Sequence, residues 1–496
     1  MKLPISWLAE YAAFPKKIGP NEIVAKLVDL GFEVEGVETF GDVSGKIIVG
    51  KVEKIETLTE FKKPIRYCHV NVGSKINEII CGAQNFVEGD LVVVALPGTR
   101  LPGDFVISER ETYGKVSQGM ICSAKEIGFG ESHEEILVLP SGLKVGSDLS
   151  ETLGLGETVL DIAVLPDRGY AMSVRGIARE LASAFGVKFR DPANFKQINI
   201  KKSSNFIAGI KTEFASKISL IKMKNYNVGS KTPIFMQKRL NQCGYRSISL
   251  PVDITNYLMI ELGQPLHAFD ADKVAGNISI RNAKPGEEIE SLDHIKRKLT
   301  IEDLVIADSK KALSVAGVMG GLESEISETT KNIIIESAIF DRATVSKTAR
   351  SLKLPSEASK RFERGTDPQI NEVAANKAAQ LLAKYGNAET VAITSAKKSV
   401  KIKSIKFDIK EVLRLIGIDI DKKVIDKIFK DLGIKVTKNG NSWNVSPPSW
   451  RHDLLMPADL VEEIIRIYGY NKIPSVLPKS NIGQGLSPTQ KIERSI

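Results

Sequence analysis

One pattern occurs twice in this sequence, and its first copy is interrupted. The stretch IVAKLVDLGFEV (residues 23–34) reappears as IDKIFKDLGIKV (residues 425–436), at an offset of 402. Both stretches are typical of an amphipathic helix, a glycine C-cap and a strand. A second pair, RGYAMSVRGIARELASAFG (168–186) and RHDLLMPADLVEEIIRIYG (451–469), aligns at an offset of 283. The repeats predict a small duplicated α+β module of winged-helix-like type.

The two offsets differ by about 119 residues, so copy one carries an insertion after its first strand. The inserted stretch is rich in short β-type runs that are separated by glycine and proline turns, which predicts a small β-barrel of OB type. We therefore expect a multidomain α+β protein with an OB-fold β-barrel inserted in the duplicated module, plus a central mixed α/β region. The predicted domains are copy one (1–40 and 156–200), the barrel (41–155), the central region (205–395), copy two (400–475) and a further segment (476–496).

Composition narrows the class of protein. A chain of 496 residues with 42% hydrophobic and 26% charged residues is typical of a soluble globular protein with several domains. No apolar run approaches the ~20 residues that cross a bilayer. The four cysteines form no CxxC pair, which favours a reducing cytosol and predicts a cytoplasmic protein without membrane contact. The net charge of +9 suits a polyanionic partner or, equally, a slightly basic solvated surface.

The inserted stretch carries an ordered series of motifs. These are VGKV (49–52), CGAQN (81–85), LPG (101–103) and SQGMICSAKEIG (117–128). The series resembles the tRNA-binding module shared by several aminoacyl-tRNA synthetases and their accessory proteins. Lys51, Lys115 and Lys125 are near these motifs and would contact phosphate. The alternative is that the small residues only form barrel corners.

Three long motifs mark the central region. They are VDITNYLMIELGQPLHAFDADKV (252–274), AGVMGGLESEI (316–326) and SEASKRFERGTDP (356–368). With the split duplication, they make the whole chain resemble the β subunit of bacterial phenylalanyl-tRNA synthetase, without the downstream catalytic-like and anticodon-binding domains. The resemblance implies that the central region is an editing domain, which hydrolyses tyrosine mischarged onto the phenylalanine tRNA.

By motif position, the resemblance implies an editing pocket lined by Arg246, His267, Gly320, Glu336, Ser356 and Ala358. Glu336 would accept the tyrosine hydroxyl, which a pocket for phenylalanine excludes only imperfectly. His267 would position substrate or water, and Arg246 would meet the ester end or the terminal adenosine. From the residues alone, His267 is also read as a core histidine and Glu336 as a salt-bridge partner. No Ser-His-Asp or Cys-His arrangement is visible, which favours bound water over a covalent nucleophile.

A third candidate site is in copy two, where four acidic residues cluster in RHDLLMPADLVEE: Asp453, Asp459, Glu462 and Glu463. On a helix that starts near Pro457, three of these residues share a face. Such carboxylates suit a hard divalent cation, and the resemblance implies Mg²⁺. The alternative is that the acids stabilise the positive end of the helix dipole.

The resemblance also implies partners. Aminoacylation would take place on a separate α subunit within an (αβ)₂ heterotetramer. The complex would use ATP, while this chain shows no Walker or Rossmann glycine spacing and is expected to bind none. Two rival functions remain. One is a free-standing hydrolase of mischarged tRNA, and the other is a non-catalytic RNA-binding scaffold, which Leu250 favours because it departs from the usual polar residue there.

Overall fold

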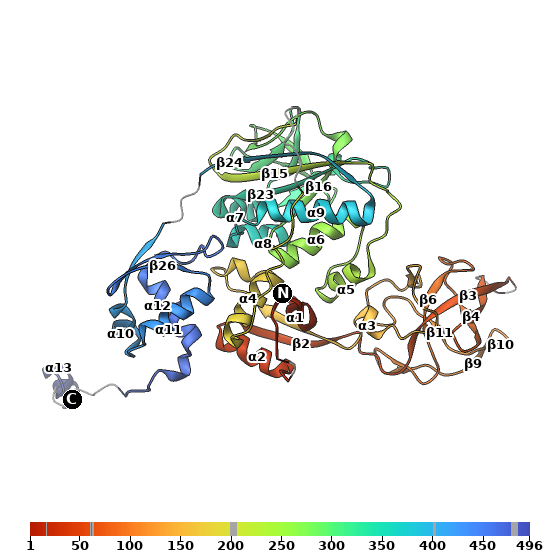
Figure 1. Cartoon of the computed structure of the whole chain (residues 1–496), viewed down its shortest axis with the longest axis horizontal. Helices are drawn as coiled ribbons and strands as arrows, with labels where there is room; N and C mark the ends of the chain where they lie inside the picture. The colour runs from red at the N-terminus through yellow and green to blue at the C-terminus, as the bar shows by residue number, and fades with distance from the viewer. Residues whose placement is uncertain (16, 60, 62–63, 199–205, 400–402, 478–484) are drawn as a thin grey trace.

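A computed structural model describes the chain apart from residues 16, 60, 62–63, 199–205, 400–402 and 478–484 (Figure 1). The domain boundaries predicted near residues 200, 205 and 400 fall on these positions, and so lie outside the described residues. A search of the described helices finds none with the length and apolar character that crossing a bilayer demands.

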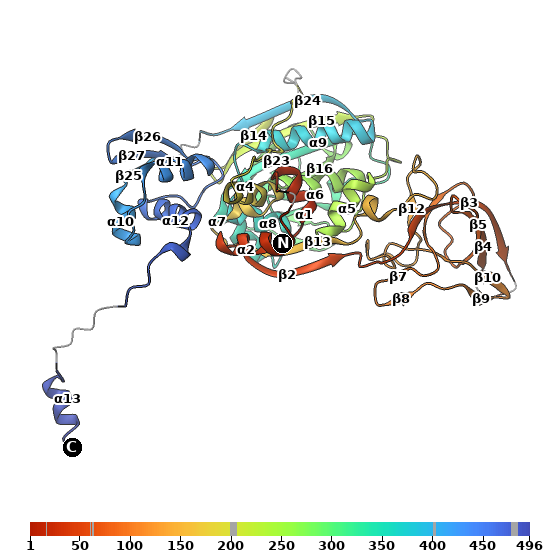
Figure 2. The ribbon, with the colours of Figure 1, turned by 60° about the horizontal axis from the view of Figure 1, so that its bottom comes forward.

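The two flanks of the insertion meet in one small sheet. Its antiparallel strands follow the order β1-β13-β2 and are β1 (Lys2–Pro4), β2 (Glu33–Phe40) and β13 (Glu157–Ala163). Phe40 is paired with Glu157, so the intervening residues leave and rejoin the module at a single point. In Figure 2, β2 runs from this module towards the inserted sheet. The helices beside it are α1 (Ile5–Tyr11), α2 (Pro20–Asp29) and α4 (Val174–Phe185).

Copy two repeats this arrangement element by element. Its sheet has the equivalent order β25-β27-β26, with strands β25 (Ile405–Asp408), β26 (Lys435–Asn439) and β27 (Ser442–Ser446). Its helices are α10 (Lys410–Ile416), α11 (Lys422–Asp431) and α12 (Pro457–Tyr468). A tight turn at residues 440–441 joins β26 to β27, where copy one carries the insertion. The first strand and helix of the two copies also correspond, β1 with β25 and α1 with α10. Their sequences share little beyond an apolar pattern.

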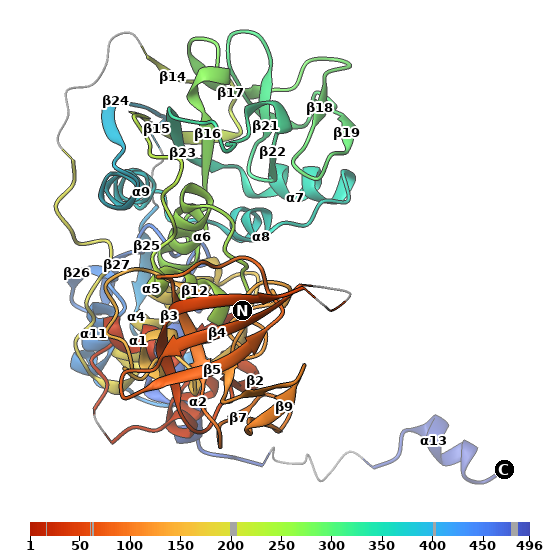
Figure 3. The ribbon, with the colours of Figure 1, turned by 90° about the vertical axis from the view of Figure 1, so that its right-hand side faces the viewer.

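The inserted residues form a curved six-stranded sheet, which faces the viewer in Figure 3. The order is β11-β6-β3-β4-β5, and β12 also pairs with β6. The strands are β3 (Ile47–Leu58), β4 (Ile65–Asn71), β5 (Ile76–Cys81), β6 (Leu91–Ala95), β11 (Met120–Ile121) and β12 (Val138–Leu139). A register shift after Val52 lets β3 pair with both β6 and β4, because a bulge bends a strand. In the described part of the chain the strand path is open at both ends, so the closed OB-type barrel stays a prediction.

Short elements complete this region. They are β7 (Arg100–Leu101), β8 (Phe105–Val106), β9 (Arg110–Thr112), β10 (Lys115–Ser117) and α3 (Ser150–Leu153). Separate clusters of apolar side chains cover the two faces of the sheet, one around Val49 and Val93 and the other around Val70 and Val92. The insertion therefore has its own hydrophobic core.

The central region is built on two sheets. The first has the antiparallel order β16-β23-β15-β24, with β15 (Ala215–Lys224), β16 (Leu266–Asp270), β23 (Ile333–Phe340) and β24 (Glu389–Lys397). The second has the order β14-β17-β20-β21-β22, with β14 (Ala208–Ile210), β17 (Ile278–Asn282), β20 (Leu304–Ala307), β21 (Ala312–Val315) and β22 (Met319–Gly320). A hairpin of β18 (Glu288–Glu290) and β19 (Lys296–Lys298) lies beside them.

Helices cover the first sheet. They include α6 (Leu250–Leu262) and α9 (Asn371–Gly386), which lie under the sheet in Figure 1. The remaining helices here are α5 (Ile234–Gln242), α7 (Arg342–Ser351) and α8 (Glu357–Arg364). All eight residues of β23 are buried, as expected for a strand covered on both faces. Glu336, a carboxylic acid, is one of these eight.

Candidate functional site

A cavity of about 300 Å³ opens between the two central sheets, α6 and α8. Five of the six predicted pocket residues line it: His267, Gly320, Glu336, Ser356 and Ala358. Its other walls are largely apolar and include Met259, Leu292, Ile306, Phe340 and Phe362. The fold thus brings together residues from the three motifs and from β23 that are as much as 91 positions apart in the chain.

Two polar side chains face each other across neighbouring strands in this cavity. His267 on β16 and Glu336 on β23 are direct antiparallel partners, which puts their side chains on the same face. Glu336 Oε1 and His267 Nε2 are both buried, and neither has a hydrogen-bond partner among the described residues. Most buried polar groups in proteins are hydrogen-bonded, so two unpartnered groups in one cavity make it a candidate site for a polar ligand.

Burial changes the protonation of both groups. It raises the pKa of Glu336 to about 8 and lowers the pKa of His267 to about 4. Each shift favours the neutral form, since the apolar surroundings stabilise neither charge. At neutral pH the cavity therefore holds mostly a protonated carboxyl group, which can donate and accept a hydrogen bond, beside an uncharged imidazole.

Gly320 leaves the space that the imidazole occupies. A Cβ atom at this position would lie 2.5 Å from His267 Cε1 and 2.8 Å from Nε2. Any other residue would displace the ring, so β22 approaches β16 closely only because position 320 is glycine.

The Ser356 hydroxyl is already engaged. It donates to the Val318 carbonyl oxygen at 2.7 Å and accepts from the Ser359 amide at 3.0 Å, as the N-cap of α8. The bonds of Ser356 fix one pocket wall and leave at most one lone pair for a ligand.

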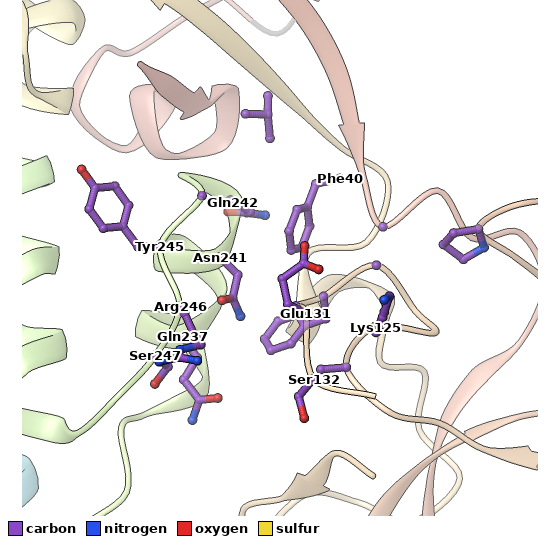
Figure 4. Close-up of a pocket in the computed structure, with 18 of the residues that line it drawn as sticks. Phe40, Lys125, Glu131, Ser132, Gln237, Asn241, Gln242, Tyr245, Arg246 and Ser247 are labelled. Carbon is purple, nitrogen blue, oxygen red and sulfur yellow. The ribbon is translucent and has the colours of Figure 1, made fainter. Parts of the chain in front are cut away.

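Arg246 lies in a different cavity from the other five residues. It follows α5 and lines a cleft of about 700 Å³ between α5 and the inserted sheet region (Figure 4). Its neighbour Tyr245 lines both the cleft and the pocket. The Tyr245 hydroxyl donates to Glu357 Oε2 at 3.1 Å, which ties it to the start of α8.

The pocket also contains residues that motif reasoning did not single out. Asn256 and Met259 project from α6 into it, and both lie within the quoted motif at 252–274. Their helical spacing relative to the buried face of α6 is a signal that would have selected them. Leu250, which departs from the usual polar residue, packs instead in the core beside Gly386.

The four acids of copy two do not form a metal site in this structure. No group of three or more His, Cys, Asp or Glu residues suited to a metal ion occurs among the described residues. Asp453 pairs with Arg451 at 2.6 Å, and Asp459 accepts from the Leu455 and Met456 amides at 2.7 and 2.8 Å. Asp459 thus stabilises the N-terminus of α12, which the sequence analysis gave as the alternative to metal binding.

The two glutamates are also paired with arginines. Glu463 Oε2 lies 2.6 Å from both Arg451 and Arg466, and Glu462, with 56% of its side chain exposed, contacts Arg168 at 3.2 Å. Burial raises the pKa of Glu463, but Arg451 and Arg466 outweigh it and hold that pKa well below its ordinary value. Arginines thus hold three of the four carboxylates and backbone amides hold the fourth, so the Mg²⁺ site stays a prediction that this arrangement does not support.

These arginines join the two copies of the module. Arg466 of copy two contacts Glu180 of copy one at 2.7 Å, and Arg168 of copy one contacts Glu463 of copy two at 3.5 Å. The Tyr170 hydroxyl donates to Glu180 at 2.8 Å. We call this buried group the ionic seam; its members are Arg168, Tyr170, Glu180, Arg451, Glu463 and Arg466.

Comparison with known proteins identifies the family. Models of three domain families match: the putative tRNA binding domain (47–148), the B3/4 domain (215–387) and the tRNA synthetase B5 domain (405–470). The phenylalanine–tRNA ligase β subunit of Thermobifida fusca is 47% identical over all of this chain and 61% of its own length. The chain belongs to the phenylalanine–tRNA ligase β-subunit family.

Other proteins similar to this chain include a second β subunit and a solved structure. The β subunit of Corynebacterium glutamicum is 44% identical over 97% of this chain and 59% of its own length. The chain thus spans about three-fifths of the length of these β subunits. An N-terminal fragment of the Pyrococcus horikoshii phenylalanyl-tRNA synthetase β subunit aligns with 64% of this chain and 88% of its own, at 14% identity and a TM-score of 0.33.

The family matches coincide with the structural regions. The putative tRNA binding domain covers the inserted sheet, and the B5 domain covers copy two from β25 to the end of α12. The B3/4 domain contains every residue of the predicted editing pocket, together with Arg246. In this member of the β-subunit family, the orphaned polar pair therefore belongs to the B3/4 domain.

Proposed function

We propose that the B3/4 pocket of this chain hydrolyses the ester of tyrosine mischarged onto the phenylalanine tRNA, while the inserted OB-type domain binds that tRNA. The single observation that carries the proposal is the buried, unpartnered Glu336 carboxyl group opposite the unpartnered His267 in an apolar cavity. The membership of the chain in the β-subunit family supports the choice of substrate.

Selectivity follows from the orphaned carboxyl group. A tyrosine ring that enters the cavity would bring a phenol hydroxyl to Glu336, whereas phenylalanine would leave the carboxyl group unpaired. A buried polar group without a partner costs roughly 1–3 kcal/mol. A pocket with such a group therefore rejects the substrate without the hydroxyl, which reverses the preference of a synthetic site for phenylalanine.

Hydrolysis would use bound water. The Ser356 hydroxyl is engaged as the helix cap, so it is not a free nucleophile. His267 is neutral, because burial lowers its pKa to about 4, and its free Nε2 would orient a water molecule or the ester. Gly320 keeps that nitrogen uncovered.

RNA binding would start on the inserted domain. Lys125 is exposed on this domain, and the Lys115 ammonium lies 4.7 Å from the centre of the Tyr67 ring, where it remains available to phosphate. Cationic side chains of this kind supply the salt-dependent part of RNA affinity.

The complete ligase would include a second kind of chain. We propose that this chain acts in the cytoplasm as part of an (αβ)₂ heterotetramer, in which the α subunit binds ATP with Mg²⁺ and attaches phenylalanine. The β chain would supply tRNA binding, editing and a scaffold. No Mg²⁺ role is assigned to the acids of copy two, because they are paired with arginines or cap a helix.

A deacylation assay with the purified chain tests this function. The phenylalanine tRNA charged with tyrosine should be hydrolysed well above the buffer rate. The same tRNA charged with phenylalanine should be spared. If no tyrosine is released, the editing function is wrong and the non-catalytic RNA-binding scaffold remains. Co-purification with the α subunit separates the remaining rival, since a free-standing hydrolase would act without that partner and show no affinity for it.

A further inference from the structure

The cleft that contains Arg246 has two walls from distant parts of the chain. One wall is the end of α5 with the loop at 244–247, and the other is formed by Phe40 and residues 124–132 of the inserted region. Figure 4 shows Asn241 on the first wall facing Glu131 on the second across an open gap. The second wall belongs to the stretch that matches the putative tRNA binding domain.

Contacts with other elements hold one wall of the cleft in place. The two walls are neighbours beside Gly130, where an added Cβ would lie 3.9 Å from Asn241 Nδ2. α5 is held in place because Arg239 Nη1 donates to Ser6 Oγ at 2.7 Å and Lys238 Nζ donates to the Glu151 carbonyl oxygen at 3.2 Å. A cleft of about 700 Å³ is small beside a nucleic acid duplex, so a single strand is the occupant that we consider.

The free polar groups of the cleft suit a nucleic acid strand. Lys2 pairs with Glu38, and Asp42 pairs with Arg100 outside the lining. Lys125, Arg246 and Glu131 are then the charged lining groups without an ion pair among the described residues. The two cations suit phosphate, the Asn241 amide suits a base edge, and the Glu131 carboxylate suits a ribose hydroxyl, which is a donor that only RNA has.

The cleft and the B3/4 pocket share one lining residue, Tyr245. In Figure 4 the Tyr245 ring points away from the gap. A strand that lay along the cleft would therefore reach the pocket of Glu336 and His267 at its terminus. The amino acid of a charged tRNA is esterified to this 3′ terminus, so it would lie in the pocket.

We propose that the cleft between α5 and residues 124–132 binds the single-stranded 3′ segment of the tRNA and leads its esterified end past Tyr245 into the B3/4 pocket. This inference rests on the proposed editing function, because it assigns the path of the same substrate. It places Lys125, Glu131 and Asn241 in RNA binding, and gives the inserted domain and the central region one continuous RNA surface.

The test compares two RNAs in a binding assay, so it does not depend on hydrolysis. Uncharged phenylalanine tRNA is measured intact and after removal of its single-stranded 3′ nucleotides, with the full chain and with Lys125→Ala/Asn241→Ala. The wild-type chain should bind intact tRNA about tenfold more tightly than trimmed tRNA, a ratio of about 1.4 kcal/mol. The variant should bind both equally. The same ratio in both proteins, or no preference in either, overturns the proposal.

A matched control and a second readout separate the cleft from the pocket. Lys435→Ala/Asn444→Ala removes the same two side-chain types from the exposed surface of copy two and should keep the wild-type ratio. In deacylation, Lys125→Ala/Asn241→Ala should raise KM for tyrosyl-tRNA about tenfold with little change in kcat, and should hydrolyse the tyrosyl ester of adenosine normally. If wild type hydrolyses neither substrate but the binding ratio holds, the editing function fails while the cleft stands.

Discussion

Replacing Glu336 by alanine tests the origin of the proposed selectivity of the B3/4 pocket. The carboxyl oxygen Oε1 is buried without a partner among the described residues, in a cavity of about 300 Å³. A phenol hydroxyl would satisfy this group, and a phenyl ring would not. We expect the wild-type chain to favour the tyrosyl over the phenylalanyl ester by the cost of one unsatisfied buried polar group.

That cost sets the expected magnitude. At roughly 1–3 kcal/mol, it corresponds to a preference of roughly 5- to 150-fold in kcat/KM. Glu336→Ala should reduce the preference to near unity, because the variant pocket has no group left to satisfy. Glu336→Gln keeps a donor and an acceptor of similar shape, and should retain part of the preference.

The assay is deacylation of the phenylalanine tRNA charged with either amino acid, measured as kcat/KM for each. Glu288→Ala, an exposed glutamate on the neighbouring hairpin strand β18, is the matched control and should behave as wild type. An unchanged Tyr-to-Phe ratio in Glu336→Ala would refute the role of this carboxyl group. An equal loss of both activities would instead assign Glu336 to hydrolysis or to the fold.

Three further outcomes follow from the same geometry. Of the two buried pocket groups, only Glu336 differs in protonation between the folded and unfolded chain from pH 6.5, the ordinary pKa of histidine, to about 8. Because the folded state holds this proton more tightly than the unfolded chain, the free energy of unfolding should fall as pH rises through this range. Thermal unfolding of Glu336→Gln should lack this decline, and a parallel decline in the variant would contradict the assignment. Gly320→Ala should abolish deacylation by displacing His267, with near-normal tRNA binding, and full activity would show that the ring tolerates a shift. Glu463→Gln should destabilise the chain by about 3–5 kcal/mol in urea unfolding, because it leaves seam arginines without their carboxylate, whereas Glu462→Gln should cost under about 1 kcal/mol; similar losses would argue against the ionic seam.

The sequence by itself determined the residues of the B3/4 pocket to a large extent. The motifs around His267, Gly320, Glu336 and Ser356 contain five of the six predicted lining residues, and these do meet in one cavity. Glu336 lies within the apolar run IIIESAIF, where a salt bridge was the alternative, and among the described residues its Oε1 has no partner. The repeats likewise predicted a duplicated module, and two sheets of equivalent strand order are present.

The tertiary structure alone decided which polar groups are free. Glu463 looked available for a metal ion, but it is paired with Arg451, Arg466 and also Arg168, which lies almost three hundred positions earlier in the chain. Arg246 was expected in the pocket, yet it lies in a cleft whose opposite wall comes from residues 124–132. Local patterns report helices, strands and buried faces, because those depend on neighbours in sequence. The charge and hydrogen-bond partners of a side chain depend on segments that only folding brings together.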